Sequence, residues 1–148
     1  MNTPQRKQWM SVLSRTSFAQ LQNSWQALRL TPEYQLIRAP EIGLAQIRAR
    51  MGATGRQFNL GDVTITRAVV KLHSGELGYS YLRGRNKRHA ELAALVDALM
   101  QTRSGHEVLE RGLIAPLAAL KKEQEECSRQ EVAASKVDFF TMVRGEDE

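Results

Sequence analysis

The residue types most able to do chemistry lie in one short run, Arg83-Gly84-Arg85-Asn86-Lys87-Arg88-His89. Four permanent positive charges fall within six residues, Arg83, Arg85, Lys87 and Arg88. The run comes directly before a predicted helix, whose first N–H groups and partial positive charge favour anions. Arginine suits a bidentate grip on phosphate oxygens. The run therefore predicts a phosphate- or phosphonate-binding turn, with two alternatives: a solvated basic turn, or ion pairs with another subunit.

Two further residues are candidates for the same chemistry. His89 lies near the inner face of the predicted helix start, where a structural histidine is the alternative to a binding one. Arg67 lies in a predicted strand at the point where the apolar residues move from one face to the other. Before it, Val63 and Ile65 are odd-numbered, whereas the apolar residues after it are even-numbered. The change indicates either a bulge that re-aims Arg67 or a strand covered on both faces.

The sequence lacks the short motifs by which many enzymes can be identified. It contains no GxxxxGK phosphate loop, GxGxxG, HExxH, GxSxG or CxxC pattern. The histidines, His73, His89 and His106, show no metal-ligand spacing, and the one cysteine, Cys127, stands among acidic residues that do not favour a thiolate. We expect no metal site, no catalytic residue and no cofactor in this chain.

The C-terminal segment 137–148 combines an apolar cluster with a polar end. The cluster consists of Phe139, Phe140, Met142 and Val143. Most chain ends are polar and loose. We therefore expect this segment to dock on the core of the chain or on a partner.

Helices are expected on both sides of a central group of strands. Residues 4–30 show helical periodicity with a break at 14–17, where Thr16 or Ser17 could cap the second piece. Residues 86–103 form the clearest helix, capped by Asn86 and ended by Ser104-Gly105. From residue 106 to about 136 the chain again favours helix, in two pieces because of Pro116.

The strand signals lie between residues 33 and 82. Residues 33–50 read as two strands separated at Ala39-Pro40, and the second alternates apolar and polar side chains. Two more strands follow, 63–73 and 77–82, with a hairpin at Ser74-Gly75. The order predicts a single α+β domain over 1–148, a roughly four-stranded antiparallel sheet flanked by N-terminal and C-terminal helices on one side.

The hydrophobic and charged fractions are those of a globular protein, and the net positive charge favours anionic partners. The 148 residues are 42% hydrophobic and 25% charged, with a net charge of +5. Positive charge favours nucleic acid, phosphorylated small molecules or acidic protein surfaces as partners. No apolar stretch predicts a membrane span and no secretory signal is visible, so we expect a cytoplasmic protein.

Long collinear segments of the sequence resemble the PhnG family, the small subunit of the bacterial carbon–phosphorus lyase core complex. The resemblance extends from about Gln8 to Gly145. The segments that carry it are QWMSVL, ARMGATGRQFNLGDVTITRAVV, LGYSYLRGRNKRHAELAALVDALMQ, LIAPL and VDFFTMVRGE.

The resemblance implies a transferase subunit in phosphonate utilisation that is not catalytic alone. The complex of this family replaces adenine of a purine nucleoside triphosphate with methylphosphonate, giving α-D-ribose 1-methylphosphonate 5-triphosphate. Its partners would be the other core subunits and, at the level of the complex, anionic phosphonate and nucleotide. The alternatives are a free-standing phosphoester enzyme using His89 with Arg67 and Arg83, and an RNA-binding module. Because aromatic residues make up only 6% of the chain and no RNP-type pattern occurs, we expect no nucleic-acid partner.

Overall fold

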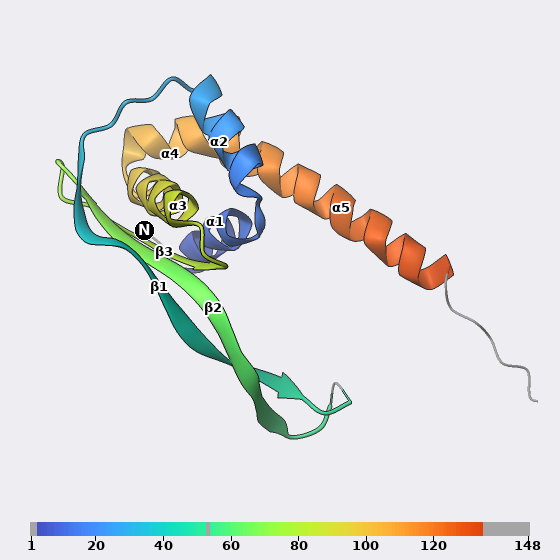
Figure 1. Ribbon diagram of the computed structural model, residues 1–148. Coiled ribbons are helices and arrows are strands. Elements are labelled where there is room, and N and C mark those ends of the chain that lie inside the picture. The colour runs from blue at the N-terminus through green and yellow to red at the C-terminus, as the bar shows by residue number, and fades with distance from the viewer. Residues whose placement is uncertain (1–2, 53, 135–148) are drawn as a thin grey trace, which may run out of the picture.

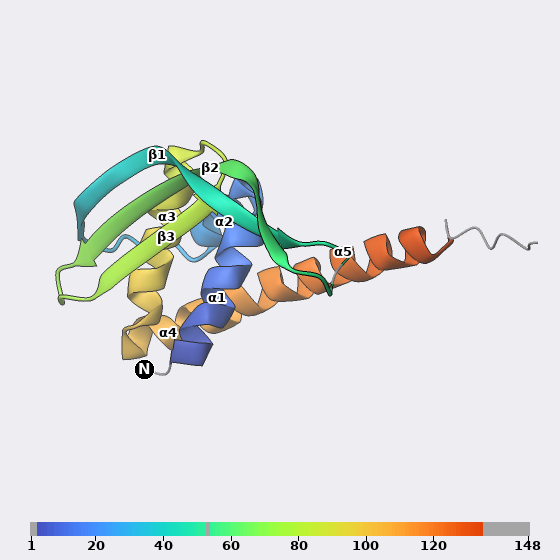
Figure 2. The same cartoon turned by 90° about the horizontal axis from the view of Figure 1, so that it is seen from below.

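A computed structural model describes residues 3–52 and 54–134 as an α+β arrangement (Figure 1). The elements in chain order are α1 (Thr3–Arg15), α2 (Phe18–Ala27), β1 (Tyr34–Arg50), β2 (Gln57–Leu72), β3 (Leu77–Arg83), α3 (Lys87–Met100), α4 (Arg103–Leu109), the π-helical turn η1 (Glu110–Ile114) and α5 (Ala115–Ala134). Helices cover one face of the sheet, and α5 runs away from the body (Figures 1 and 2). The α+β class predicted from the sequence is confirmed.

Capping side chains begin several of these helices. Ser17 accepts a hydrogen bond from the N–H of Gln20 in a reciprocal capping box, and Asn86 caps α3, both as predicted. The predicted helix end at Ser104-Gly105 is wrong. Those residues lie inside α4, because the Thr102 hydroxyl caps a new helix by accepting from the N–H of Gly105 at 3.0 Å.

The sheet of the described residues has three antiparallel strands in the order β1-β2-β3, so the predicted fourth strand is wrong. The two strands expected in 33–50 are one strand, β1. Between Arg38, paired with Val69, and Glu41, paired with Arg67, β1 contains one residue more than β2. Pro40 lies in this bulge on an edge strand, where its missing N–H breaks no ladder bond.

The β1–β2 pair continues past the end of β3 as a two-stranded ribbon, which we call the arm (residues 44–52 and 54–63; Figures 1 and 2). The last residue of β2 paired with β3 is Ile65, opposite Arg83. Gly61 and Asp62 are residue types that favour a turn, yet both lie inside β2, beside a register shift opposite Ile47.

The shift of apolar residues from odd to even positions near Thr66 is not caused by a bulge in β2. Pairing of β2 with β3 is unbroken from Ile65 to Lys71, and the irregularity lies in β1. Thr66 is fully buried on the core face together with Ala68 and donates its hydroxyl to the Gly84 carbonyl at 2.7 Å. The core face therefore keeps its period of two, with a threonine where the sequence pattern suggested a break.

Helix α3 lies directly on the core face of the sheet. An added Cβ at Gly78 would lie 1.9 Å from the Ala94 carbonyl oxygen, so only glycine permits this approach of β3 to α3. Small residues of α3, including Ala90, Ala94 and Ala98, are fully buried at the contact. Close packing of backbone against backbone thus fixes the height of α3 above β3.

A buried carboxylate joins α1, α3 and β3. Asp97 has no exposed surface, and its two oxygens accept four hydrogen bonds. Arg6 donates to both oxygens at 2.6 and 3.1 Å, the Trp9 indole N–H donates at 2.9 Å, and the backbone N–H of Tyr79 donates at 2.9 Å. A buried charge with a paired cation and filled acceptor sites is stable, whereas one that loses its partners is costly.

Replacing Asp97 by alanine is expected to lower the free energy of unfolding by about 3–5 kcal/mol, because the guanidinium, the indole N–H and the strand N–H lose their acceptor together. Urea unfolding followed by circular dichroism measures the change. The matched control, Glu123→Ala, removes an exposed carboxylate on α5 and should stay within about 0.5 kcal/mol. Equal stability of the two variants would contradict the role given to Asp97.

Candidate functional site

The basic run forms the tight turn between β3 and α3. Gly84 takes a φ of 103°, which disfavours other residues, and its N–H bonds back to the Thr64 carbonyl at 2.9 Å. The Asn86 side chain then accepts from the His89 N–H at 3.0 Å and starts α3. The geometry presents the cations of the turn around the N-terminal end of a 14-residue helix.

All four cations of this turn are exposed, and in the described part of the chain none of them forms an ion pair. The residues are Arg83, Arg85, Lys87 and Arg88. Positive side chains at a helix N-terminus oppose the helix dipole. The turn therefore holds uncompensated positive charge that an anion or an acidic surface would neutralise.

His89 belongs to the core side of this turn. It is buried, its ring centroid lies 5.9 Å from that of Phe18, and its Nε2 has no hydrogen-bond partner among the described residues. Burial lowers the pKa of His89 below its ordinary value, and the Leu13 carbonyl opposes this only in part. The neutral ring thus packs against α1 and α2 and does not join the exposed cations.

Arg67 lies on the sheet face opposite the helices. Its Nε donates to Glu41 Oε1 at 2.5 Å, and this carboxylate raises the pKa of the Arg67 guanidinium. Arg38 approaches the same oxygen at 3.6 Å. Arg67 is therefore held in a local ion-pair cluster and does not extend the basic turn.

The residues of the phosphoester alternative are not brought together. Arg67 and Arg83 are odd-numbered residues of β2 and β3, so both side chains leave the sheet on the face away from the helices. His89 is buried on the other side, beneath α1 and α2. The sheet separates the imidazole from the two guanidinium groups.

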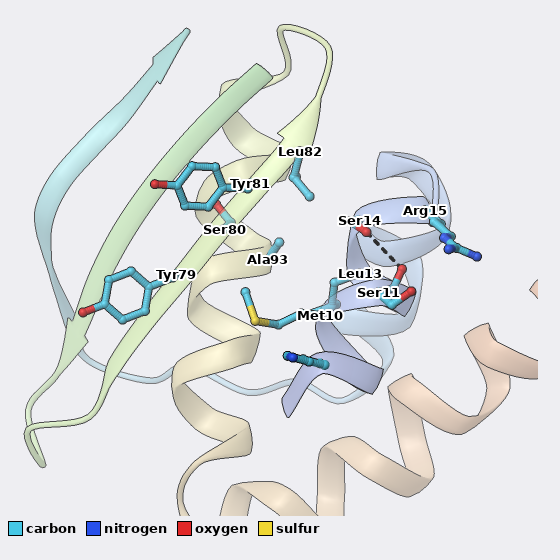
Figure 3. A pocket seen from close by; sticks show the side chains of 11 residues that line it. Met10, Ser11, Leu13, Ser14, Arg15, Tyr79, Ser80, Tyr81, Leu82 and Ala93 are labelled. Atoms are coloured by element: carbon cyan, nitrogen blue, oxygen red, sulfur yellow. Dashed lines mark hydrogen bonds between the residues drawn. The ribbon is translucent and has the colours of Figure 1, made fainter. Parts of the chain in front are cut away.

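Two hollows occur near the turn. One of about 340 Å³ lies between α1 and β3 (Figure 3). The other, of about 390 Å³, has apolar walls from α2 and α3 with Arg88 and Glu91 among its lining residues. There the Tyr34 hydroxyl donates to Glu91 at 2.7 Å, which raises the pKa of Tyr34 to about 12. The lining residues of these two hollows include no histidine or cysteine that could act as base or thiolate nucleophile.

The described residues form neither a metal-binding cluster nor a membrane-spanning helix. Within 3–52 and 54–134, no group of histidine, cysteine and carboxylate side chains is arranged to hold a metal ion. Cys127 is exposed on α5. None of the described helices combines the length and apolar character needed to cross a membrane. The predicted docking residues Phe139, Phe140, Met142 and Val143 lie outside the described residues.

Fold and site together define an α+β protein with an exposed basic turn between β3 and α3. The family model described as "Phosphonate metabolism protein PhnG" matches residues 4–145. A curated relative from Rhizobium meliloti (strain 1021), "Alpha-D-ribose 1-methylphosphonate 5-triphosphate synthase subunit PhnG", is 41% identical over 143 residues, covering 97% of this chain and 91% of the relative. The chain belongs to the PhnG family, which confirms the resemblance seen in the sequence.

Sequence reasoning missed Asp97, the residue that positions β3 and hence the turn that follows it. A signal was available, because Asp97 interrupts the apolar run Ala93-Ala94-Leu95-Val96 and Ala98-Leu99-Met100. An acidic residue on the inner face of a helix requires a buried partner. The partner, Arg6, lies 91 residues away and could not be identified from spacing.

Stability should depend on pH through His89. Because its folded-state pKa lies below the unfolded value of about 6.5, the unfolded chain binds more protons. Stability is then full above about pH 6.5 and falls as the pH is lowered toward the folded-state pKa. The wild type should lose more stability between about pH 7.5 and about pH 5.5 than His89→Gln, as measured by urea midpoints. Equal losses would show that His89 titrates normally.

Proposed function

We propose that the chain is a non-catalytic subunit of a transferase complex that makes α-D-ribose 1-methylphosphonate 5-triphosphate. The relative from Rhizobium meliloti is named as a subunit of that synthase. In the proposed reaction methylphosphonate displaces adenine at the ribose C1 of a purine nucleoside triphosphate. The nucleotide is a substrate of the complex, and other core subunits are the partners of this chain.

The observation that carries the subunit role is the arm. It extends past β3 as an isolated two-stranded ribbon, which is only marginally stable in water unless it packs on something. Large apolar side chains on it are exposed: Leu44 by 70%, Met51 by 72% and Leu60 by 59%. Apolar surface of this kind marks contact sites with other proteins. The arm thus supports a chain that completes its packing inside an assembly.

The positive charge of the basic turn is complementary to the anionic substrates of the proposed complex. A nucleoside triphosphate and a phosphonate are both anions, and the basic turn offers arginine side chains that form no ion pair with any described residue, beside a helix N-terminus. In one version of the proposal the turn lines the path of these anions. In the other it pairs with carboxylates of a neighbouring subunit.

The triple variant Arg83→Ala, Arg85→Ala, Arg88→Ala tests the turn within the purified complex. Loss of charge-assisted hydrogen bonds should weaken nucleotide binding by about tenfold or more if the turn lines the anion path. If the turn is an interface, the variant chain should instead fail to co-purify. Nucleotide affinity from calorimetry and subunit composition from native mass spectrometry measure the two outcomes.

A control with the same loss of charge is available elsewhere on the surface. Arg103→Ala, Arg111→Ala and Lys122→Ala remove three exposed cations from α4, η1 and α5. This control should leave nucleotide affinity and assembly unchanged. A basic-turn variant that assembles, binds nucleotide normally and keeps full transferase activity would refute both versions.

A further inference from the structure

Strand β3 is an edge of the sheet, and the hydrogen bonds show which of its backbone groups face outward. The Gly84 N–H bonds to Thr64 on β2, so even-numbered residues of β3 point their N–H and C=O groups at β2. Odd-numbered residues point theirs away from the sheet. The contacts of Tyr79 and Leu77 agree, since the N–H of the first and the carbonyl of the second bond to groups outside the sheet.

Only the first half of this edge is covered. The Tyr79 N–H donates to Asp97, and the Leu77 carbonyl accepts from Arg6 at 3.2 Å and from Gln101 at 2.7 Å. Two residues further along, the Tyr81 N–H also faces outward, and no group in 3–52 or 54–134 accepts from it. An open strand edge is a template for pairing with another strand.

A groove runs beside the open half of the edge (Figure 3). One wall is β3 from Tyr79 to Leu82, and the other is α1. Four of the α1 residues, Lys7, Met10, Ser11 and Ser14, share one helix face at i, i+3, i+4 and i+7, and Leu13 and Arg15 lie beside them. A groove of about 340 Å³ between an edge strand and a helix is the arrangement that binds extended peptides by strand addition.

The groove has an apolar interior and a basic rim. Met10, Leu13 and Leu82 line the interior, whereas Lys7 and Arg15 lie at its border, and no aspartate or glutamate lines it. Arg83 follows directly on β3 and adds a third cation. Arg15 has one weak partner, Glu125 at 3.4 Å with both side chains largely exposed. The chemistry of the site suits an extended segment with alternating apolar and acidic residues.

We propose that the groove between α1 and β3 receives an extended segment of another subunit, which adds a strand to the sheet at Tyr81. This inference rests on the proposed subunit role. Main-chain hydrogen bonds from the Tyr81 N–H and C=O hold the segment, an apolar side chain fills the hollow near Met10, and carboxylates pair with Lys7 and Arg15.

A second copy of this chain does not fit the groove as well. Because the Tyr79 N–H and the Leu77 carbonyl are already bonded, two β3 edges could pair about a two-fold axis only through residues 81 and 83. In that register the Arg83 side chains of the two copies lie diagonally across the strand pair on the same face. Like charges across a strand pair are destabilising. The occupant is therefore a chain of opposite charge.

Hydrogen exchange at two neighbouring amides tests the proposal. In the assembled complex the Tyr81 amide should exchange about tenfold or more slowly than in the chain alone, as one net hydrogen bond requires. The Tyr79 amide, already bonded to Asp97, should change little and is the internal control. Site-resolved exchange measured by mass spectrometry or NMR gives both values from one sample.

Two variants of Tyr81 distinguish the contribution of its backbone N–H to binding from that of its side chain. Tyr81→Pro removes the outward N–H without removing a β2–β3 ladder bond, which an edge strand tolerates. Tyr81→Thr removes the ring and keeps the N–H. The proline variant should lose about tenfold or more in affinity for the other subunits, and the threonine variant should lose little.

Three other outcomes would overturn the proposal, each for a different reason. An assembled complex in which the Tyr81 amide exchanges as fast as in the free chain would overturn the proposal and leave the subunit role intact. Protection of Tyr81 in the chain alone, with the mass of a dimer, would overturn it in favour of a second copy. If no complex forms with any subunit, the proposed function itself fails and this inference fails with it.

Discussion

The buried carboxylate of Asp97 is the constraint on which the rest of the structure depends. It belongs to α3, and it contacts α1 through Arg6 and Trp9 and β3 through the Tyr79 N–H. A desolvated charge tolerates few arrangements of its partners, because each unfilled acceptor site costs free energy. The interaction therefore fixes α1 along the edge of the sheet, and with it the entry into the basic turn.

Within residues 3–52 and 54–134, this arrangement leaves three surfaces uncovered: the arm, the far half of the β3 edge and the basic turn. Among these described residues the arm exposes apolar side chains, the Tyr81 amide has no acceptor and the cations of the turn have no ion-pair partner. Membership of the PhnG family and the name of the Rhizobium meliloti relative agree with a protein whose surfaces are completed by other subunits.

Local signals in the sequence predicted most elements because their causes are local. Ser17 and Asn86 cap helices through bonds to residues three positions away, and alternation along Ala45, Ile47 and Ala49 follows from the pleat. The fourth strand was wrong because Pro40 can be absorbed by a bulge when it lies on an edge strand, and edge position is a property of the whole sheet. The basic turn was placed correctly, but the isolation of His89 and Arg67 from it depends on which sheet face each occupies, and Asp97 depends on a partner remote in sequence.

We propose that this chain contributes to the transferase without catalysing the reaction itself. The most direct test is the formation of α-D-ribose 1-methylphosphonate 5-triphosphate, with release of adenine, by three samples: the chain alone, the other core subunits alone, and the complete mixture. We expect product only from the complete mixture, so that adding the chain back to the other subunits restores activity. Product from the chain alone, or undiminished product from the other subunits without it, would contradict the claim.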